Sequence, residues 1–150
     1  MLVNTRFFGE VDLPEEKILT FEHGLIGLGE YKKFTILYDC DKEDSNISWL
    51  QSVEEPSFAL PVIKPWLVKE DYNPVVEDEL LKHIGELTEE NLVILTTMTV
   101  PEDVKQMSVN LKAPIIINGC LTWLVLFSVH IRFATGSGSH HSPCHCFRCL

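Results

Sequence analysis

The stretch Asn91-Leu92-Val93-Ile94-Leu95-Thr96-Thr97-Met98-Thr99-Val100 decides the fold class of this chain. It is rich in β-branched and long apolar side chains, and it contains neither glycine nor proline. This composition is typical of a β-strand. Shorter runs of the same character occur at 2–8, 18–21, 34–38, 47–53, 58–63 and 113–118. Strands this short, separated by turn residues, predict a mainly β protein with a barrel or sandwich architecture.

Two stretches carry a helical pattern. The range 77–84 places three apolar side chains on one face, and Gly85 follows where a helix would end. The range 101–107 opens with a proline and two acidic residues, which helix N-termini favour. We therefore expect one or two short helices beside the strands. Pro61 lies inside the expected strand 58–63, and a proline there favours an edge or bulged strand.

Charge narrows the class of partner. The chain carries 22 acidic residues against 12 lysines and arginines, a formal net charge of −10. Such a surface repels nucleic acid, because affinity for phosphates comes mainly from lysine and arginine. It attracts basic protein surfaces and speeds encounter with them. We therefore expect protein partners and no direct binding to nucleic acid, although net charge alone also serves solubility.

Charge and cysteine content both divide the chain near residue 118. Residues 1–118 hold all 22 acids and ten basic residues, a net of −12, whereas residues 119–150 hold only two arginines. Four of the five cysteines also follow residue 118. We therefore expect one domain over 1–118 and an atypical segment over 119–150. Within that segment, 121–133 is expected to form one strand or an exposed aggregation-prone stretch, followed by a disordered Cys/His-rich tail.

The sequence also bears on the cellular compartment. The opening residues 1–6 lack the basic and apolar pattern of a signal peptide. Cys40 is the only cysteine of residues 1–118, so no disulfide framework is indicated there. The longest apolar stretch, 121–133, is too short to cross a bilayer, which needs about 20 residues. We therefore expect a cytoplasmic protein without membrane contact, and a monomer.

Catalytic patterns are weak, and we expect no enzyme and no cofactor. The spacing of Gly24, Gly27 and Gly29 matches neither a phosphate-binding loop nor a dinucleotide fingerprint, so a tight turn is the better interpretation. His23 and His83 have no nucleophile near them in a recognisable motif. Paired acids occur at 54–55 and 70–71, and solvated charge is a better interpretation of them than acid–base chemistry.

The tail holds the one metal-like pattern. Residues 140–149 contain three histidines and three cysteines, which are soft ligands for zinc or copper. The pattern lacks the distant second ligand pair of a zinc finger, and the Gly-Ser run 136–139 before it reads as a linker. We therefore expect no functional metal site and interpret the tail as foreign to the fold's own design, from an altered reading frame or a fusion scar.

Five segments together resemble the FliW-type flagellar assembly factors over about residues 1–118. Phe8-Gly9-Glu10 resembles the opening "FGE" of that family, and 18–27 resembles its "ITFxxGIxGF" stretch. The segment 49–56 is similar to "WLQSxxDP", 100–103 to "VPED" and 110–118 to "NLxAPIxIN". The order and spacing of these segments make the resemblance specific.

The resemblance implies a small antiparallel β-barrel-like domain in the bacterial cytoplasm. Such proteins bind the carbon storage regulator, an RNA-binding translational repressor of flagellin, and they also bind flagellin. Free flagellin occupies the assembly factor and leaves the repressor active. After flagellin export, the freed factor binds the repressor, which then releases the message. This partner switch uses competing equilibria and needs no chemistry on the bound partner.

Exposed aromatic residues ringed by charge are typical of protein-binding patches, and the segments of the family resemblance supply such residues. A core position on a strand is the alternative for Trp49 and Phe58, and burial is equally an alternative for Trp66 and Tyr72. The candidate partner-binding residues are Trp49, Gln51, Glu54, Glu55, Pro56, Phe58, Trp66, Asp71, Tyr72 and Asn110.

The sequence departs from the family after Asn118. The family continues there with a polar strand, whereas residues 119–127 are largely apolar. Two other functions therefore stay open beside the partner switch. One is metal binding or redox chemistry by the Cys/His tail, and the other is a simple flagellin chaperone without a regulatory partner.

Overall fold

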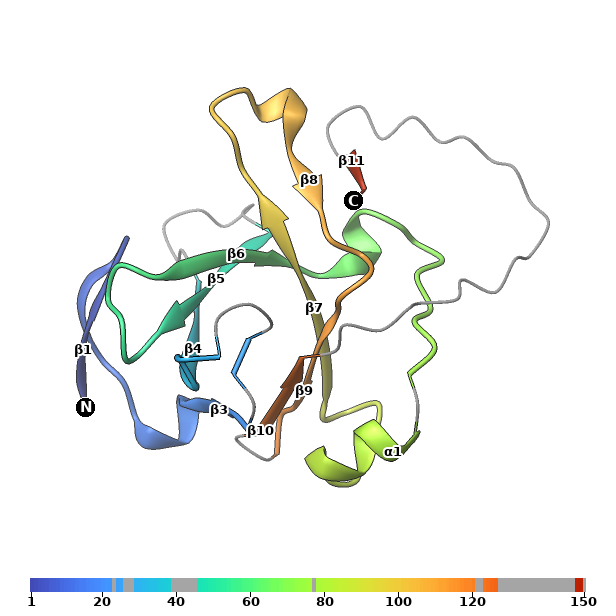
Figure 1. The fold of residues 1–150 in the computed structure, drawn as a ribbon, viewed down its shortest axis with the longest axis horizontal. Helices are drawn as coiled ribbons and strands as arrows, with labels where there is room; N and C mark the ends of the chain where they lie inside the picture. Colours follow the sequence, from blue (N-terminus) through green and yellow to red (C-terminus); the bar gives the residue numbers. More distant parts are fainter. Residues whose placement is uncertain are drawn as a thin grey trace.

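A computed structural model describes residues 1–22, 24–25, 29–38, 46–76, 78–120, 123–126 and 148–149 (Figure 1). The range 39–45, and the Cys/His tail apart from the backbone of 148–149, lie outside the described residues. The described strands are β1 (Leu2–Thr5), β2 (Gly9–Asp12), β3 (Leu19–Phe21), β4 (Lys33–Tyr38), β5 (Ile47–Ser52), β6 (Ala59–Ile63), β7 (Leu92–Thr99), β8 (Ser108–Val109), β9 (Ile115–Asn118), β10 (Trp123–Leu126) and β11 (Arg148–Cys149).

Helical structure is confined to single turns within the described residues. The α-helix α1 covers Asp78–Leu81 and continues into the 3₁₀ turn η3 (Lys82–Ile84). Gly85 ends this segment with a φ of 78°, as the sequence predicts. The other 3₁₀ turns are η1 (Glu15–Lys17), η2 (Pro65–Leu67) and η4 (Val104–Gln106). The helix expected over 101–107 is therefore shorter than predicted. No helix of the described residues is long and apolar enough to cross a membrane.

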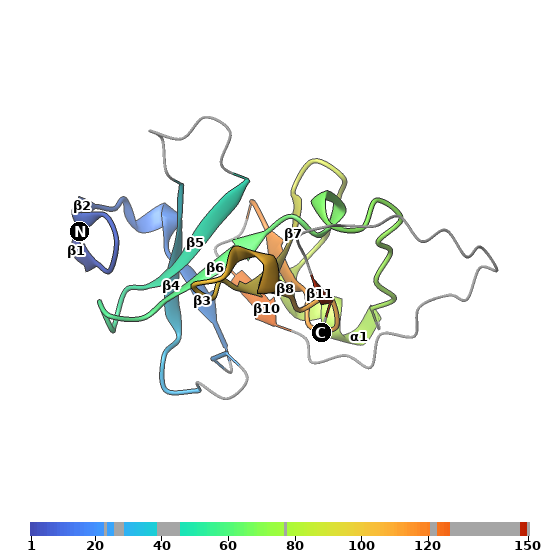
Figure 2. The ribbon, with the colours of Figure 1, turned by 90° about the horizontal axis from the view of Figure 1, so that it is seen from above.

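The strands follow one another in a barrel-like arrangement. Pairing runs from β7 through β6, β5, β4, β3 and β10 to β9, and β9 pairs again with β7. Of the described ladders, only β10–β3 and β11–β8 are parallel. Figure 2 shows how strongly the strands twist across one another. The mainly β, barrel-like fold class predicted from the sequence is confirmed.

The stretch 91–100 forms the longest described strand, β7. It pairs with β9 over Leu92–Leu95 and with β6 at Thr96 and Thr97. Its last two residues pair with β8. Its residues contribute to two buried clusters, one containing Ile94 and Met98 and the other containing Leu95. The strand therefore joins both halves of the core, because its side chains alternate between the two faces.

Pro61 lies in the part of β6 that has a neighbouring strand on one side only. It pairs with Trp49 of β5, whereas β6 pairs with β7 only at Val62 and Ile63. The first part of β6 therefore has no β7 partner, and the missing N–H of Pro61 breaks no described ladder.

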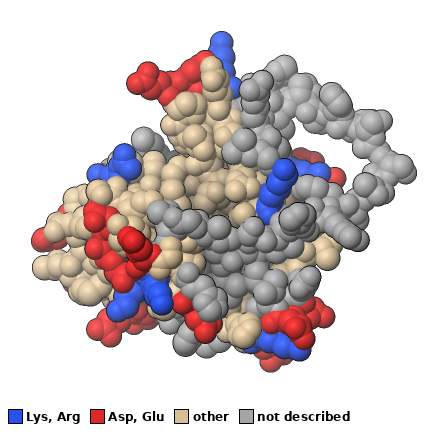
Figure 3. Space-filling view, in the orientation of Figure 1, with Lys and Arg blue, Asp and Glu red and all other residues tan. Residues whose placement is uncertain are grey.

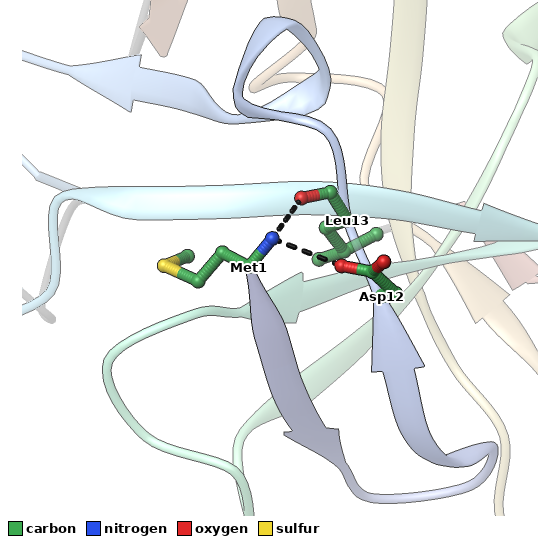
Figure 4. A network of polar contacts seen from close by, with 3 residues as sticks. All are labelled: Met1, Asp12 and Leu13. Atoms are coloured by element: carbon green, nitrogen blue, oxygen red, sulfur yellow. Dashed lines mark hydrogen bonds and ion pairs between the residues drawn. The ribbon is translucent and has the colours of Figure 1, made fainter.

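The N-terminus forms a separate hairpin, β1–β2, and differs from the expected strand 2–8. β1 ends at Thr5, because its hydroxyl accepts the N–H of Phe8 (3.0 Å) and donates to the carbonyl of Gly9 (2.7 Å), which closes a turn. Figure 4 shows the other end of the hairpin, where the Met1 amine donates to the Asp12 carboxylate (3.0 Å) and the Leu13 carbonyl (2.8 Å).

The segment that departs from the family still takes part in the fold through its backbone. β10 pairs antiparallel with β9 and parallel with β3, at Thr20 and Phe21. Within 121–133, the structure describes a strand at Trp123–Leu126, and the remainder of that range lies outside the described residues.

Candidate partner-binding surfaces

The candidate residues of 49–58 lie where β5 turns into β6, and Gln51 organises this corner. Its side chain is 1% exposed. Its Oε1 accepts the N–H of Arg6 (3.0 Å), and its Nε2 donates to the carbonyls of Ser52, Pro56 and Phe58 at 2.9–3.1 Å. Gln51 therefore fastens the N-terminal hairpin and the turn to the barrel. The side chain of Gln51 is thus buried beneath the surface, and its contact with a partner stays a prediction.

Two acids of this corner have different local roles. The Glu54 carboxylate accepts the backbone N–H groups of Lys32 (2.5 Å) and Lys33 (2.9 Å). The Glu55 carboxylate accepts the Ser57 hydroxyl (2.6 Å) and the Ser57 N–H (3.1 Å). Both bonds hold the pKa of Glu55 below its ordinary value, and the bond from the hydroxyl has the larger effect. These hydrogen bonds hold both carboxylates in fixed positions, next to the exposed Pro56.

The aromatic residues of the corner divide between surface and core. Phe58 is half-buried and packs on the core beside Tyr31 and Phe34, with ring centroids 5.8 and 6.2 Å away. Trp49 is half-buried on the other face and lies against Phe7, with ring centroids 4.2 Å apart. Phe7 is half-exposed, and the Arg6 guanidinium lies 5.1 Å from its ring centre. Trp49 and Phe7 thus form an aromatic pair at the surface, with a cation beside it.

A second surface surrounds Trp66, which is 43% exposed on η2. It lines a hollow of about 400 Å³ whose floor includes Ile94 of β7 and Ile116 of β9. Tyr72 also lines this hollow but is 3% exposed, and its hydroxyl donates to the Leu111 carbonyl (2.9 Å). Burial raises the pKa of Tyr72 to about 12. The exposed Asp71 forms an ion pair with Lys69 at 3.7 Å.

Asn110 is half-buried after β8, and its side chain has a local role. Its Oδ1 accepts the N–H of Lys112 (3.1 Å), while its own N–H donates to the Thr97 carbonyl (2.9 Å). The structure therefore does not bring the ten predicted residues into one patch. It places 49–58 at the corner beside the hairpin, Trp66 and Tyr72 at the hollow, and Asn110 after β8.

Two residues that matter for these surfaces were missed from sequence. Strand propensity predicts Phe7 as part of a strand, and its contact with Trp49 spans 42 positions of sequence. Asn118 was noted only as the end of a family segment. It is 1% exposed and donates from Nδ2 to the carbonyls of Ile84 (2.8 Å) and Glu86 (3.2 Å). The available sequence signal for such an anchor is a polar asparagine directly after three isoleucines, because a buried polar side chain needs hydrogen-bond partners.

Charge is unevenly distributed over the described surface. In the view of Figure 3, acidic side chains gather over the hairpin side and again over α1, with fewer basic ones between them. Within the described residues, no three His, Cys, Asp or Glu side chains are grouped in a way that could hold a metal ion. The described surface therefore offers acidic and aromatic groups, which suit protein contacts.

Comparison of the structure with solved ones defines the class. A crystal structure of the flagellar assembly factor FliW superposes with a TM-score of 0.79 at 25% identity, covering 87% of this chain and 89% of that one. The fold is thus that of a mainly β flagellar assembly factor.

Sequence comparison then gives the family. The model of the FliW protein family matches residues 2–120, and the chain belongs to this family. A flagellar assembly factor FliW from Lachnoclostridium phytofermentans is 55% identical over 156 residues, covering 96% of this chain and 100% of that protein. One from Lachnospira eligens is 49% identical over 120 residues, covering 79% of this chain and 80% of that protein. The resemblance proposed from five short segments is confirmed.

Proposed function

We propose that this chain acts without catalysis as a cytoplasmic, monomeric partner switch that binds the carbon storage regulator and flagellin in turn. The observation that carries the proposal is membership of the flagellar assembly factor family over residues 2–120. When flagellin is scarce, the free factor binds the regulator and relieves repression of flagellin synthesis. When flagellin accumulates, it occupies the factor, and repression returns.

The chemistry of the described surface supports this proposal. Residues 1–118 carry a net charge of −12, which complements a basic RNA-binding partner and repels the RNA itself. Trp66 and the Trp49–Phe7 pair expose aromatic area beside fixed acids such as Glu54 and Glu55. Such aromatic groups carry much of the binding free energy in protein interfaces. We assign the contacts to the exposed and half-buried candidates and give Gln51 and Tyr72 supporting positions beneath them.

The family match also bears on the other two functions. It covers the domain and ends at residue 120, so it favours a binding role of the domain over a metal or redox role of the Cys/His tail. A simple flagellin chaperone fits the family equally well, because it would use the same domain. The two binding functions differ in one respect, which is whether the regulator binds at all.

Isothermal titration with the purified regulator, and separately with flagellin, tests the proposal. We expect heat and a complex on a sizing column with each partner, and displacement of the regulator when flagellin is added. No complex with the regulator would overturn the switch and leave the chaperone. A complex that holds both partners at once would also contradict it.

A further inference from the structure

The hollow beside Trp66 is an apolar groove with a defined floor, and we call it the Trp66 groove. Ile94 and Ile116 form its floor, while Leu81 and Leu87 line it from the α1–η3 region. Its volume of about 400 Å³ lies within the range of ligand and side-chain pockets. Apolar residues at its margin are also exposed. Trp66 is 43% and Leu92 37% exposed, so apolar area continues from the floor to the rim.

The surroundings of the Trp66 groove are acidic. Eight of its ten lining residues come from the segment 66–92. The described part of that segment has seven exposed acids against two lysines, and one of these lysines, Lys69, forms the ion pair with Asp71. An apolar groove formed largely by an acidic segment favours an occupant with the opposite charge at its edges.

The contacts that the Trp66 groove offers also restrict the occupant's conformation. Its lining is dominated by apolar side chains, so an inserted backbone finds few hydrogen-bond partners there. A helix satisfies its own backbone groups and presents apolar side chains at positions i, i+3 and i+4 on one face. A groove of this size accommodates a few such side chains.

From these observations we propose that the Trp66 groove is the docking site for an amphipathic helix of a partner protein, with leucine-like side chains in the groove and lysine or arginine at its edges. This inference deepens the proposed function, on which it rests for the role of protein binding. The aromatic pair at Phe7 is a separate surface, because β1 and α1 lie at opposite ends of the molecule in Figures 1 and 2.

A pair of synthetic peptides tests the proposal with the full chain. The probe has about 18 residues, or five helical turns, with leucine on one face and lysine on the other. Its twin carries glutamate in place of lysine. Amide NMR spectra of the unmodified protein, together with titration calorimetry, locate and measure binding. We expect the lysine peptide to shift the amides of Leu87, Leu92 and Ile94, and the glutamate peptide to leave them unchanged.

Two variants connect the binding to the Trp66 groove. Trp66→Ala should weaken the lysine peptide about tenfold or more, which corresponds to about 1.4 kcal/mol. Tyr38→Ala, at an exposed aromatic residue at the end of β4 that does not line the groove, should leave its affinity unchanged. Equal loss in both variants, equal binding of the glutamate peptide, or amide shifts away from the groove would each overturn the proposal.

Other occupants give distinct outcomes. Self-association of the unmodified chain that Trp66→Ala abolishes would assign the groove to a second copy and overturn the helix proposal. Binding of the lysine peptide only after removal of residues 127–150 would assign it to the chain's own end, with the same consequence. If the regulator and flagellin bind while Trp66→Ala affects neither them nor the peptide, the groove assignment fails and the proposed function stands.

Discussion

The Gln51 side chain accepts a hydrogen bond from the backbone N–H of Arg6, 45 positions earlier in the chain, at 3.0 Å. The same amide donates to carbonyls on both sides of the β5–β6 turn. One buried side chain therefore fixes the N-terminal hairpin, the strand and the turn relative to each other. This arrangement holds Phe7 against Trp49, so the aromatic surface depends on a buried residue.

Gln51→Leu should lower the free energy of unfolding by about 2–4 kcal/mol, because it leaves several buried backbone groups without partners while keeping a similar volume. Urea unfolding followed by circular dichroism measures the change. Gln106→Leu, at an exposed glutamine of η4, is the matched control and should change stability by less than about 0.5 kcal/mol. A loss of similar size in both variants would contradict the anchoring role.

Glu54→Ala should destabilise the protein by about 1–2 kcal/mol, because the backbone N–H groups of Lys32 and Lys33 lose a charged acceptor. Faster amide hydrogen exchange at these two residues should accompany the loss. Glu102→Ala, at an exposed acid before η4, removes the same charge and serves as the control. Unchanged exchange at Lys32 and Lys33 would show that the carboxylate does not hold them.

Ser57→Ala should raise the pKa of Glu55 toward its ordinary value, because the bond from the hydroxyl is the largest cause of the lowered pKa. The folded pKa lies below the unfolded one, so the contribution to stability is present above the unfolded pKa and lost as pH falls through the folded pKa. NMR titration of the Glu55 carboxyl carbon measures the shift. The remaining Ser57 N–H bond should keep the recovery partial.

Tyr72→Phe should cost about 0.5–1.5 kcal/mol at neutral pH, because the Leu111 carbonyl loses its donor. The variant should also lack the loss of stability that ionisation of Tyr72 causes in the wild-type protein at high pH. An unfolded tyrosine ionises near 10, whereas Tyr72 resists ionisation until about 12, so the wild-type fold is weakened as pH rises between these values. Comparing unfolding of the two proteins from pH 9 to 12 measures this difference. Tyr31→Phe, at a half-buried tyrosine, is the control.

Much of the fold could be predicted from local patterns. The apolar run 91–100 became β7, and Gly85 ended the α1–η3 segment as expected. The end of β1 at Thr5 could not be predicted, because it depends on a hydroxyl that bonds to both Phe8 and Gly9. Strand propensity predicts that residues 6–8 continue the strand, but the hydrogen bonds of Thr5 form a turn there instead.

The candidate site was predictable as a set of residues and not as an arrangement. Tyr72 and Trp66 are six positions apart and line the same hollow, yet one is buried and the other exposed. In the sequence, both are single aromatic residues within a few positions of Lys69. The hydroxyl of Tyr72 donates to the Leu111 carbonyl, 39 positions later in the chain, and the local sequence does not indicate this bond.

By itself, the sequence determined the strand-rich fold class, the acidic character of residues 1–118 and the family, because these follow from local composition and ordered short motifs. Tertiary structure alone decided which aromatic residues reach the surface, that Gln51 and Asn118 are buried anchors, and that Trp66 borders a groove. Those properties depend on hydrogen bonds and packing between residues 30 or more positions apart, such as Gln51 with Arg6 and Asn118 with Ile84. No local pattern encodes such distant pairs, since each is fixed only when the strands between them have paired.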